Sequence, residues 1–212
     1  PTYTLNRTLF PYTTLFRSYN FAMALPETPL MMLMHQDEIL APAFLEKVLD
    51  ALNHAKDPII AFTNYLEMHN DEVDKKPSTM VRIKRMLLWP SLVHAWQGTW
   101  IGKRGIQLLG NPITHPTVVC VKDKMPEPVF LEKYKASMDW DLWERLSRQK
   151  GSFVYVKDVL LYHRMNDLNQ TAKLLKTTNA RYDDEYEIFC RFWPKWIAKL
   201  LMKFYSGAAK YY

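Results

Sequence analysis

The amino-acid sequence predicts an α/β fold, in which helices flank a sheet, and three observations support this prediction. Leu30–Met34 is a short apolar run after a proline, as in a strand that is buried on both faces of a sheet. After Pro42, apolar residues recur at helical spacing as far as Leu52. Thr117–Val121 is rich in β-branched residues and reads as another strand.

The chain has 212 residues, but its first part is excluded from the fold prediction. Residues 8–18, TLFPYTTLFRS, resemble a translated sequencing adapter, so we expect residues 1–18 to be an artefactual segment. The natural protein is then expected to begin upstream of Tyr19. The remaining roughly 194 residues are enough for one ordinary domain with a sizeable core.

Composition excludes several classes of protein. Seven Trp, twelve Tyr and ten Phe argue against intrinsic disorder. The formal net charge is +6, and Arg7 and Arg17 of the excluded segment contribute to it. The sequence has no cluster of basic and aromatic residues that would indicate a nucleic-acid partner. No apolar run reaches the roughly 18–20 residues of a membrane-spanning helix. We expect Cys120 and Cys190 to be reduced packing residues in a cytosolic protein.

The other elements of the first half follow in order. Tyr19–Leu25 is predicted to be the tail of a helix, and Ile59–Phe62 a second strand that ends in Thr63–Tyr65. His69–Lys76 reads as an exposed loop that becomes a helix. The helix carries basic residues that are either solvated or contact phosphates of a ligand or lipid, namely Arg82, Lys84 and Arg85.

In the second half, a helix is predicted over Ile101–Leu109, with Gly110 just after it. Ser137 is predicted to cap a further helix that continues to Leu146. Phe153–Val156 and Val159–Tyr162 read as two short strands that flank a charged pair.

Two stretches carry candidate chemistry. Asp37 and Glu38 follow the first apolar run, at the strand end where ligands bind in α/β sheets, and adjacent carboxylates suit a divalent cation. The alternative is a polar turn that ends a core strand. Asp139 lies in a first helical turn, where it either interacts with the helix dipole or faces a cleft as a general base. His115 is expected to be a loop histidine that hydrogen-bonds the backbone.

Four motifs occur in order, namely HQDE at 35–38, NPITHPT at 111–117, DWDLWERL at 139–146 and LLYHRMND at 160–167. Over Tyr19–Thr171 the chain therefore resembles the family 2 glycosyltransferases. The resemblance implies the C-terminal part of an A-type catalytic domain, a Rossmann-like mixed sheet with flanking helices. It also implies that the N-terminal nucleotide-binding half, on the order of 60–90 residues, is missing.

The resemblance also implies a set of site residues. The family's strand-end acidic motif binds a divalent cation, Mg or Mn, that bridges the donor diphosphate. Here Asp37 and Glu38 take the metal position, with Gln36 beside the donor. The family's catalytic base matches Asp139, although Met138 replaces the usual Glu.

A third family feature, Tyr-Arg-x-His after the last strand, is altered in this chain. Asn166 stands where the family has the His, and its amide oxygen is a possible ligand for Mg or Mn. His163 and Arg164 are the implied contacts of the diphosphate.

The function implied is inverting transfer of a sugar from a nucleotide-sugar donor to a glycan or lipid-linked acceptor. Such transfer serves the synthesis of cell-surface polysaccharide or glycolipid, in the cytoplasm or at the inner face of the plasma membrane. The competing hypothesis is a non-catalytic, degenerate transferase module that binds glycan or membrane without metal.

Residues 172–212 are predicted to be a separate helical extension. From Arg191 to Tyr212 there are five basic residues and no acid. Lysines at a four-residue spacing and tryptophans predict a basic amphipathic helix, with peripheral membrane contact through 191–205. The alternative is a helix packed on the catalytic domain.

Overall fold

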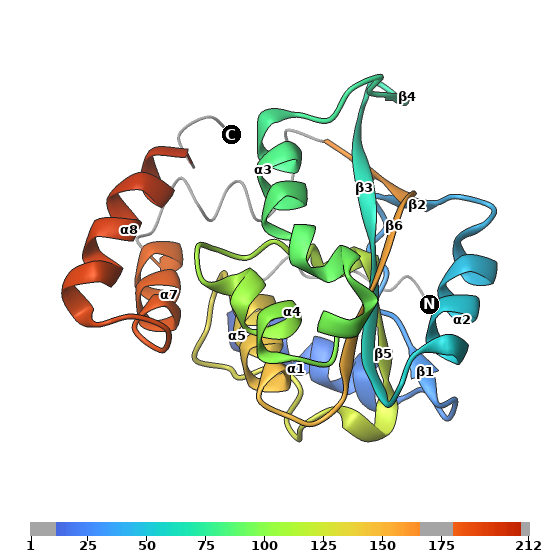
Figure 1. Cartoon of the computed structure of the whole chain (residues 1–212), viewed down its shortest axis with the longest axis horizontal. Helices are drawn as coiled ribbons and strands as arrows, with labels where there is room; N and C mark the ends of the chain where they lie inside the picture. The colour runs from blue at the N-terminus through green and yellow to red at the C-terminus, as the bar shows by residue number, and fades with distance from the viewer. Residues whose placement is uncertain (1–11, 166–179, 209–212) are drawn as a thin grey trace, which may run out of the picture.

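The structure, a computed structural model, describes residues 12–165 and 180–208. It confirms an α/β fold with a mixed sheet and flanking helices (Figure 1). The strand order is β1-β5-β3-β6-β2, and β4 pairs with β3. The strands are β1 (Leu30–Met31), β2 (Glu38–Leu40), β3 (Pro58–His69), β4 (Glu72–Val73), β5 (Val118–Val121) and β6 (Ser152–Arg164).

The described helices confirm most of the predicted ones. The α-helices are α1 (Tyr12–Ala24), α2 (Phe44–His54), α3 (Thr79–Leu87), α4 (Trp100–Lys103), α5 (Met138–Ser147), α7 (Ala180–Phe189) and α8 (Lys195–Ala208). Short 3₁₀ turns are η1 (Trp89–Leu92), η2 (His94–Trp96), η3 (Gly105–Gln107), η4 (His115–Thr117) and η5 (Lys122–Lys124). α1 begins inside the segment that was excluded from the fold prediction. Within the described residues, no helix is both long enough and apolar enough to cross a membrane.

The parallel pair β3 and β6 forms the centre of the sheet, and it corrects one prediction. Phe153–Val156 and Val159–Tyr162 are not two strands, because β6 runs without interruption from Ser152 to Arg164. The charged residues between them lie where the β3–β6 register shifts, and the Asn64 side chain donates to the Lys157 carbonyl there. A bulge of this kind has the composition of a turn but does not end the strand.

The first apolar run is also shorter than predicted. Only Leu30–Met31 is a strand, and it pairs antiparallel with β5 at the edge of the sheet. Asp37 lies in a turn, and Glu38 is itself the first residue of β2. The prediction that both acids follow the end of a buried strand is therefore wrong. β3 is longer than predicted and continues to His69.

The predicted helix over Ile101–Leu109 is interrupted as well. α4 ends at Lys103, and η3 follows from Gly105. Two glycines in this stretch lower its helix propensity, since glycine is about 1 kcal/mol less favourable than alanine in a helix. Ser137 is the N-cap of α5, but its side chain makes no capping hydrogen bond.

The helices cover both faces of the sheet (Figure 1). α2 lies on one face, where Phe44, Val48 and Leu52 pack against Ala61, Val119 and Val154. α5 lies on the other face, where Leu142, Trp143 and Leu146 pack against Ile60, Phe62 and Phe153. α7 and α8 lie outside α5 and pack on Trp140 and Tyr134 through Ile188, Phe189, Ala198 and Met202. Both cysteines are free, as expected.

Candidate metal centre

Three side chains that could hold a metal ion meet at the end of the sheet where β3 and β6 finish. They are Asp37, Glu38 and His163, whose ligand atoms all lie within 4.8 Å of one another. Glu38 and His163 are paired residues of the antiparallel strands β2 and β6. His163 Nδ1 lies 2.8 Å from Glu38 Oε1, a hydrogen bond between residues that are 125 positions apart.

A turn brings Asp37 to the same place. The backbone N–H of Glu38 donates to the carbonyl of His35 across this turn, at 3.3 Å. The carbonyl of Asp37 accepts a hydrogen bond from the N–H of Arg164 at 2.9 Å, which attaches the turn to the end of β6. One hydrogen bond within the turn and one to β6 therefore fix the backbone that carries Asp37.

Glu38 is the buried member of the group. The residue is only 8% exposed, and its Oε2 has no hydrogen-bond partner within the described parts of the chain. An ionised carboxylate that is buried without a partner for one oxygen is costly. Two carboxylates and an imidazole are ligands that Mn²⁺ accepts, and the carboxylate oxygens suit Mg²⁺. The donor set thus fits a divalent cation, and a cation would satisfy the unpaired oxygen.

The surroundings of His163 are strongly negative. Burial alone would lower the pKa of His163, but its hydrogen bond to the Glu38 carboxylate and the charges of Glu38, Asp37 and Glu67 raise it overall. The excess of negative charge favours a positive charge at this position, carried either by a proton or by a metal ion.

Glu67 is a fourth titratable residue at this place, and the sequence prediction did not include it. It lies on β3 opposite His163 in the parallel ladder and is 5% exposed. Glu38, His163 and Glu67 thus form one row across three adjacent strands, on one face of the sheet. An acid inside the otherwise apolar strand sequence YLEM is the signal that could have identified it.

This row lies on the face that α3 covers. Two residues before His163 on the same strand, Leu161 packs against Tyr65 and against Val81 of α3. Burial and the charge of Glu67, with a smaller effect of Glu38, raise the pKa of Tyr65 to about 12. Tyr65 therefore lies close to the acidic row.

Asp139 does not belong to the metal-ligand group, but it lies on the same side of the sheet. Its Oδ2 accepts a hydrogen bond from Asn111 and its Oδ1 one from the N–H of Trp140, both at 2.8 Å. Burial raises the pKa of Asp139, although the nearby charge of Lys84 opposes the shift. Lys84 Nζ in turn lies 5.5 Å from the ring centre of Tyr65. Lys84 and Tyr65 thus connect Asp139 to the acidic row.

Two histidines lie beside the turn that carries Asp37. The rings of His35 and His115 contact each other edge to face, with their centres 5.7 Å apart. His115 also stacks on Trp143 of α5, so its ring packs between aromatic side chains. Burial and the charge of His35 lower the pKa of His115 to about 3, and the ring is therefore neutral.

Two other predicted site residues, Gln36 and Arg164, are not members of the metal-ligand group. Gln36 is exposed in the turn beside Asp37. The side chain of Arg164 forms an ion pair with Asp71 of the β3–β4 hairpin at 3.0 Å. Asn166 lies outside the described residues. His163, for which the family resemblance implies a contact with the diphosphate, is one of the three side chains that could hold a metal ion.

A pocket of about 980 Å³ lies elsewhere in the described residues. It lies where β3 and β6 begin and is lined by residues that include His54, Asp57, His94 and Ser152. The metal-ligand group is at the opposite ends of these two strands, so the pocket and the group are separate features. In comparisons with protein-family models and with curated proteins, this chain has no match.

Proposed function

We propose that this chain is the metal-binding and catalytic part of a sugar transferase of the family 2 glycosyltransferase type. One observation supports the proposal above all others. Asp37 and Glu38 are far from His163 in the sequence, yet the three side chains form one group, in which a buried oxygen of Glu38 has no hydrogen-bond partner among the described residues. The substrates would be a nucleotide-sugar and a hydroxyl of a glycan or a lipid-linked acceptor.

In the proposed reaction, the acceptor oxygen forms a bond to the anomeric carbon while the bond from that carbon to the donor diphosphate breaks. The configuration at carbon inverts, and the nucleoside diphosphate leaves with the bonding electrons. A divalent cation held by Asp37, Glu38 and His163 would neutralise charge on that leaving group.

Asp139 would accept the proton of the attacking hydroxyl. Burial raises its pKa, and a base whose pKa is closer to neutrality transfers protons more effectively. Its two hydrogen bonds, from Asn111 and Trp140, orient the carboxylate and leave lone pairs for the acceptor. Arg164 would exchange its exposed partner Asp71 for diphosphate oxygens.

The first test is metal binding by the purified chain, measured by calorimetric titration with Mn²⁺. Asp37→Asn and Glu38→Gln should each weaken binding by more than about 10-fold, because each removes a charged ligand. Glu46→Gln, on the exposed side of α2, is the matched control and should bind like the wild type. Equal Mn²⁺ affinity in all four proteins would contradict the metal site.

The second test is turnover of a panel of nucleotide-sugars with Mn²⁺. Asp139→Asn should lower kcat by about 10²–10⁴-fold, the usual effect of removing a general base, while Mn²⁺ affinity stays unchanged. Binding of glycan that requires no metal and is unaffected by these substitutions would instead favour the non-catalytic module.

A further inference from the structure

The last helix carries two parallel rows of exposed side chains. Trp196, Leu200 and Phe204 are 70%, 48% and 73% exposed and recur every four residues. Lys195, Lys199 and Lys203 form a second exposed row at the same spacing. Because residues four apart lie above one another on a helix, an apolar stripe runs along α8 beside a basic stripe.

The apolar stripe is not the surface by which α8 packs on the domain. That surface is formed by Ala198 and Met202, which are completely buried against α7 and the region around Trp140. Trp196, Leu200 and Phe204 face outward on the other side of the helix. Large apolar side chains that form an exposed stripe indicate a binding surface.

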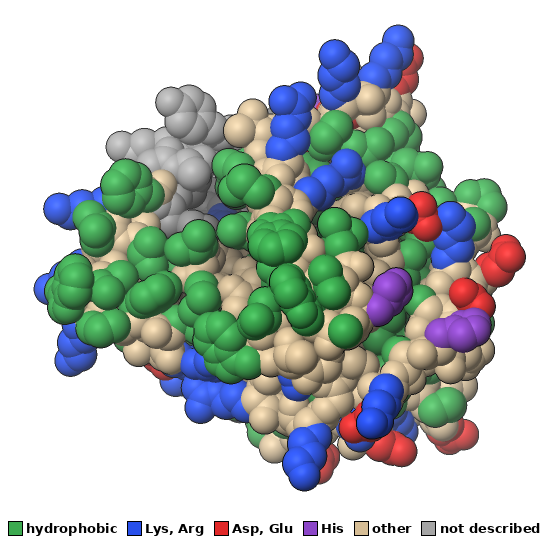
Figure 2. Space-filling model, viewed as in Figure 1, with side chains coloured by type: hydrophobic (Ala, Val, Ile, Leu, Met, Phe, Trp, Pro, Cys, Tyr) green, Lys and Arg blue, Asp and Glu red, His purple; other side chains and the backbone are tan. Residues whose placement is uncertain are grey.

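The stripe continues onto neighbouring elements. The segment before α8 is held against the α4–η3 region, because Trp193 Nε1 donates to the Leu108 carbonyl and Arg104 donates to the Arg191 carbonyl, both at 2.8 Å. Figure 2 shows hydrophobic side chains across this face from α8 to the helices at the centre of the view. The elements in this region carry exposed apolar side chains, namely Met86 of α3, Trp89 and Leu92 of η1, Trp100 and Ile101 of α4, and Leu109 just after η3. We call these residues and the α8 stripe the apolar face.

Charge at the edge of the apolar face is positive. Within the described residues, none of the three α8 lysines forms an ion pair, and no acid occurs from Arg191 to the end of α8. If a second copy of this chain packed its own α8 against this helix, lysines would face lysines, because α8 contains no acid. A surface with regularly spaced negative charge above an apolar layer complements both rows at once.

We propose that the apolar face binds the surface of a bilayer that contains anionic lipids. α8 lies in the plane of the interface, with Trp196, Leu200 and Phe204 among the acyl chains and the lysine row at the headgroups. Aromatic and aliphatic residues beside Lys are typical of such interfacial helices. This inference goes beyond the proposed transfer reaction and does not depend on it.

The test is flotation of the full chain with vesicles of phosphatidylcholine, with and without phosphatidylglycerol. The protein should float with the anionic vesicles and bind the neutral ones much more weakly. Each lysine near an anionic surface strengthens binding about fivefold, so Lys195→Gln, Lys199→Gln and Lys203→Gln together should weaken it about 100-fold. High salt should have a similar effect, because it screens these charges.

A matched pair of double variants tests the apolar stripe. Leu200→Glu with Phe204→Glu should abolish flotation. Leu45→Glu with Leu49→Glu, at exposed positions four apart on α2, should leave it unchanged, because α2 covers the opposite face of the sheet. Circular dichroism checks that each variant is folded.

Three outcomes would overturn the proposal. The first is no flotation of the wild type with anionic vesicles. The second is flotation that the α8 variants do not reduce. The third is a dimer in sedimentation analysis that Leu200→Glu with Phe204→Glu dissociates, since the apolar face would then be occupied by a second copy.

Discussion

At the scale of single residues, Gly102 in α4 shows how closely the backbone packs beside the apolar face. A Cβ atom at this position would lie 2.2 Å from the carbonyl oxygen of Trp96 and 2.6 Å from its carbonyl carbon. Both are backbone atoms, which cannot move aside by changing a rotamer. The hydrogen of glycine is therefore the only substituent that fits here without a shift of the chain.

Gly102→Ala should lower the free energy of unfolding by about 1–3 kcal/mol, the usual cost of forcing extra atoms into a packed site. Gly98→Ala is the control, because a Cβ there would meet no atom closer than 3.9 Å. Urea unfolding of both variants measures the difference. Equal stability of the two variants would show that the chain around Trp96 can move.

Asp139 gives a prediction about pH. Burial raises its pKa in the folded chain above the ordinary value of 3.8, so folding favours the protonated form. The contribution of Asp139 to stability is therefore greatest at low pH and is lost as pH rises through the folded pKa. The Asp139→Asn variant has no titratable group at this position, so it does not lose this stability as pH rises.

The Asp139→Asn variant should become more stable relative to the wild type as pH rises from 3.8, the ordinary pKa, towards neutrality. Thermal unfolding across this pH range measures the change. Asp123→Asn, at an exposed position, should show no such trend. A constant difference between Asp139→Asn and the wild type at every pH would contradict a raised pKa.

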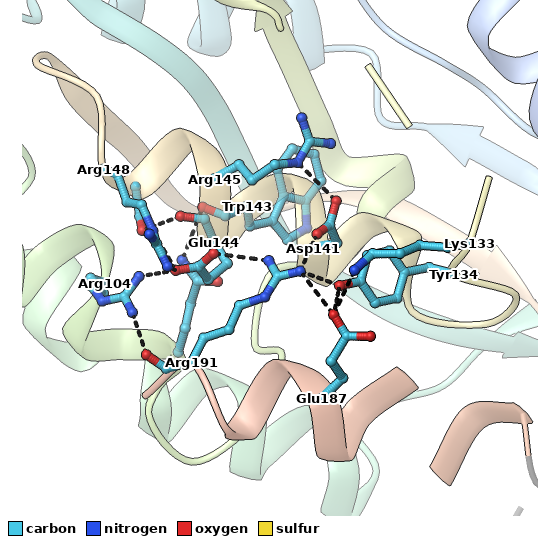
Figure 3. A network of polar contacts seen from close by, with 12 residues as sticks. Arg104, Lys133, Tyr134, Asp141, Trp143, Glu144, Arg145, Arg148, Glu187 and Arg191 are labelled. Atoms are coloured by element: carbon cyan, nitrogen blue, oxygen red, sulfur yellow. Dashed lines mark hydrogen bonds and ion pairs between the residues drawn. The ribbon is translucent and has the colours of Figure 1, made fainter. Parts of the chain in front are cut away.

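At the scale of elements, a buried ionic network joins α5 to the chain between α7 and α8 (Figure 3). Glu144 of α5, whose side chain is 1% exposed, contacts Arg104, Arg148 and Arg191. Arg191 also lies 2.8 Å from Asp141. Because Arg191 precedes α8, this network holds the segment that leads into the last helix against α5.

Burial alone would raise the pKa of Glu144, but hydrogen bonds from Arg104, Arg148 and Arg191 lower it overall. The stability that Glu144 contributes is complete above the ordinary glutamate pKa of 4.5 and is lost as pH falls through the folded pKa. Removal of the charge at neutral pH leaves the arginines with too few partners.

Glu144→Gln should therefore cost about 3–5 kcal/mol at neutral pH, as expected when one partner of a buried ion pair is removed. The variant should also lose less stability than the wild type in acid. Asp158→Asn breaks an exposed ion pair with Lys47 and should cost less than about 1 kcal/mol. Urea unfolding at neutral and acid pH tests both effects, and similar costs for the two variants would show that the network contributes little.

At the scale of the whole molecule, local patterns predicted the helices better than the strands. The apolar spacing of α2 and the basic amphipathic pattern of α8 lie within one element and were visible in the sequence. β6 was divided wrongly because a bulge at Lys157 has the local composition of a turn. Such a bulge is distinguished from a turn only by the partner strand.

In the candidate site, too, single residues could be predicted from the sequence, but contacts between strands could not. Asp37, Glu38 and His163 could each be singled out from the sequence, but their contact could not, because it depends on the register between β2 and β6. Glu67 was missed because it lies inside a strand, and its position opposite His163 follows from the parallel pairing of β3 with β6. Register is a property of the assembled sheet.

The row formed by Glu38, His163 and Glu67 takes one residue from each of three strands that are not consecutive along the chain. The candidate ligands themselves come from two of these places, with Asp37 and Glu38 at the start of β2 and His163 on β6. A cation held by Asp37, Glu38 and His163, as we propose, would link the start of β2 to the end of β6 and would oppose the separation of these two strands.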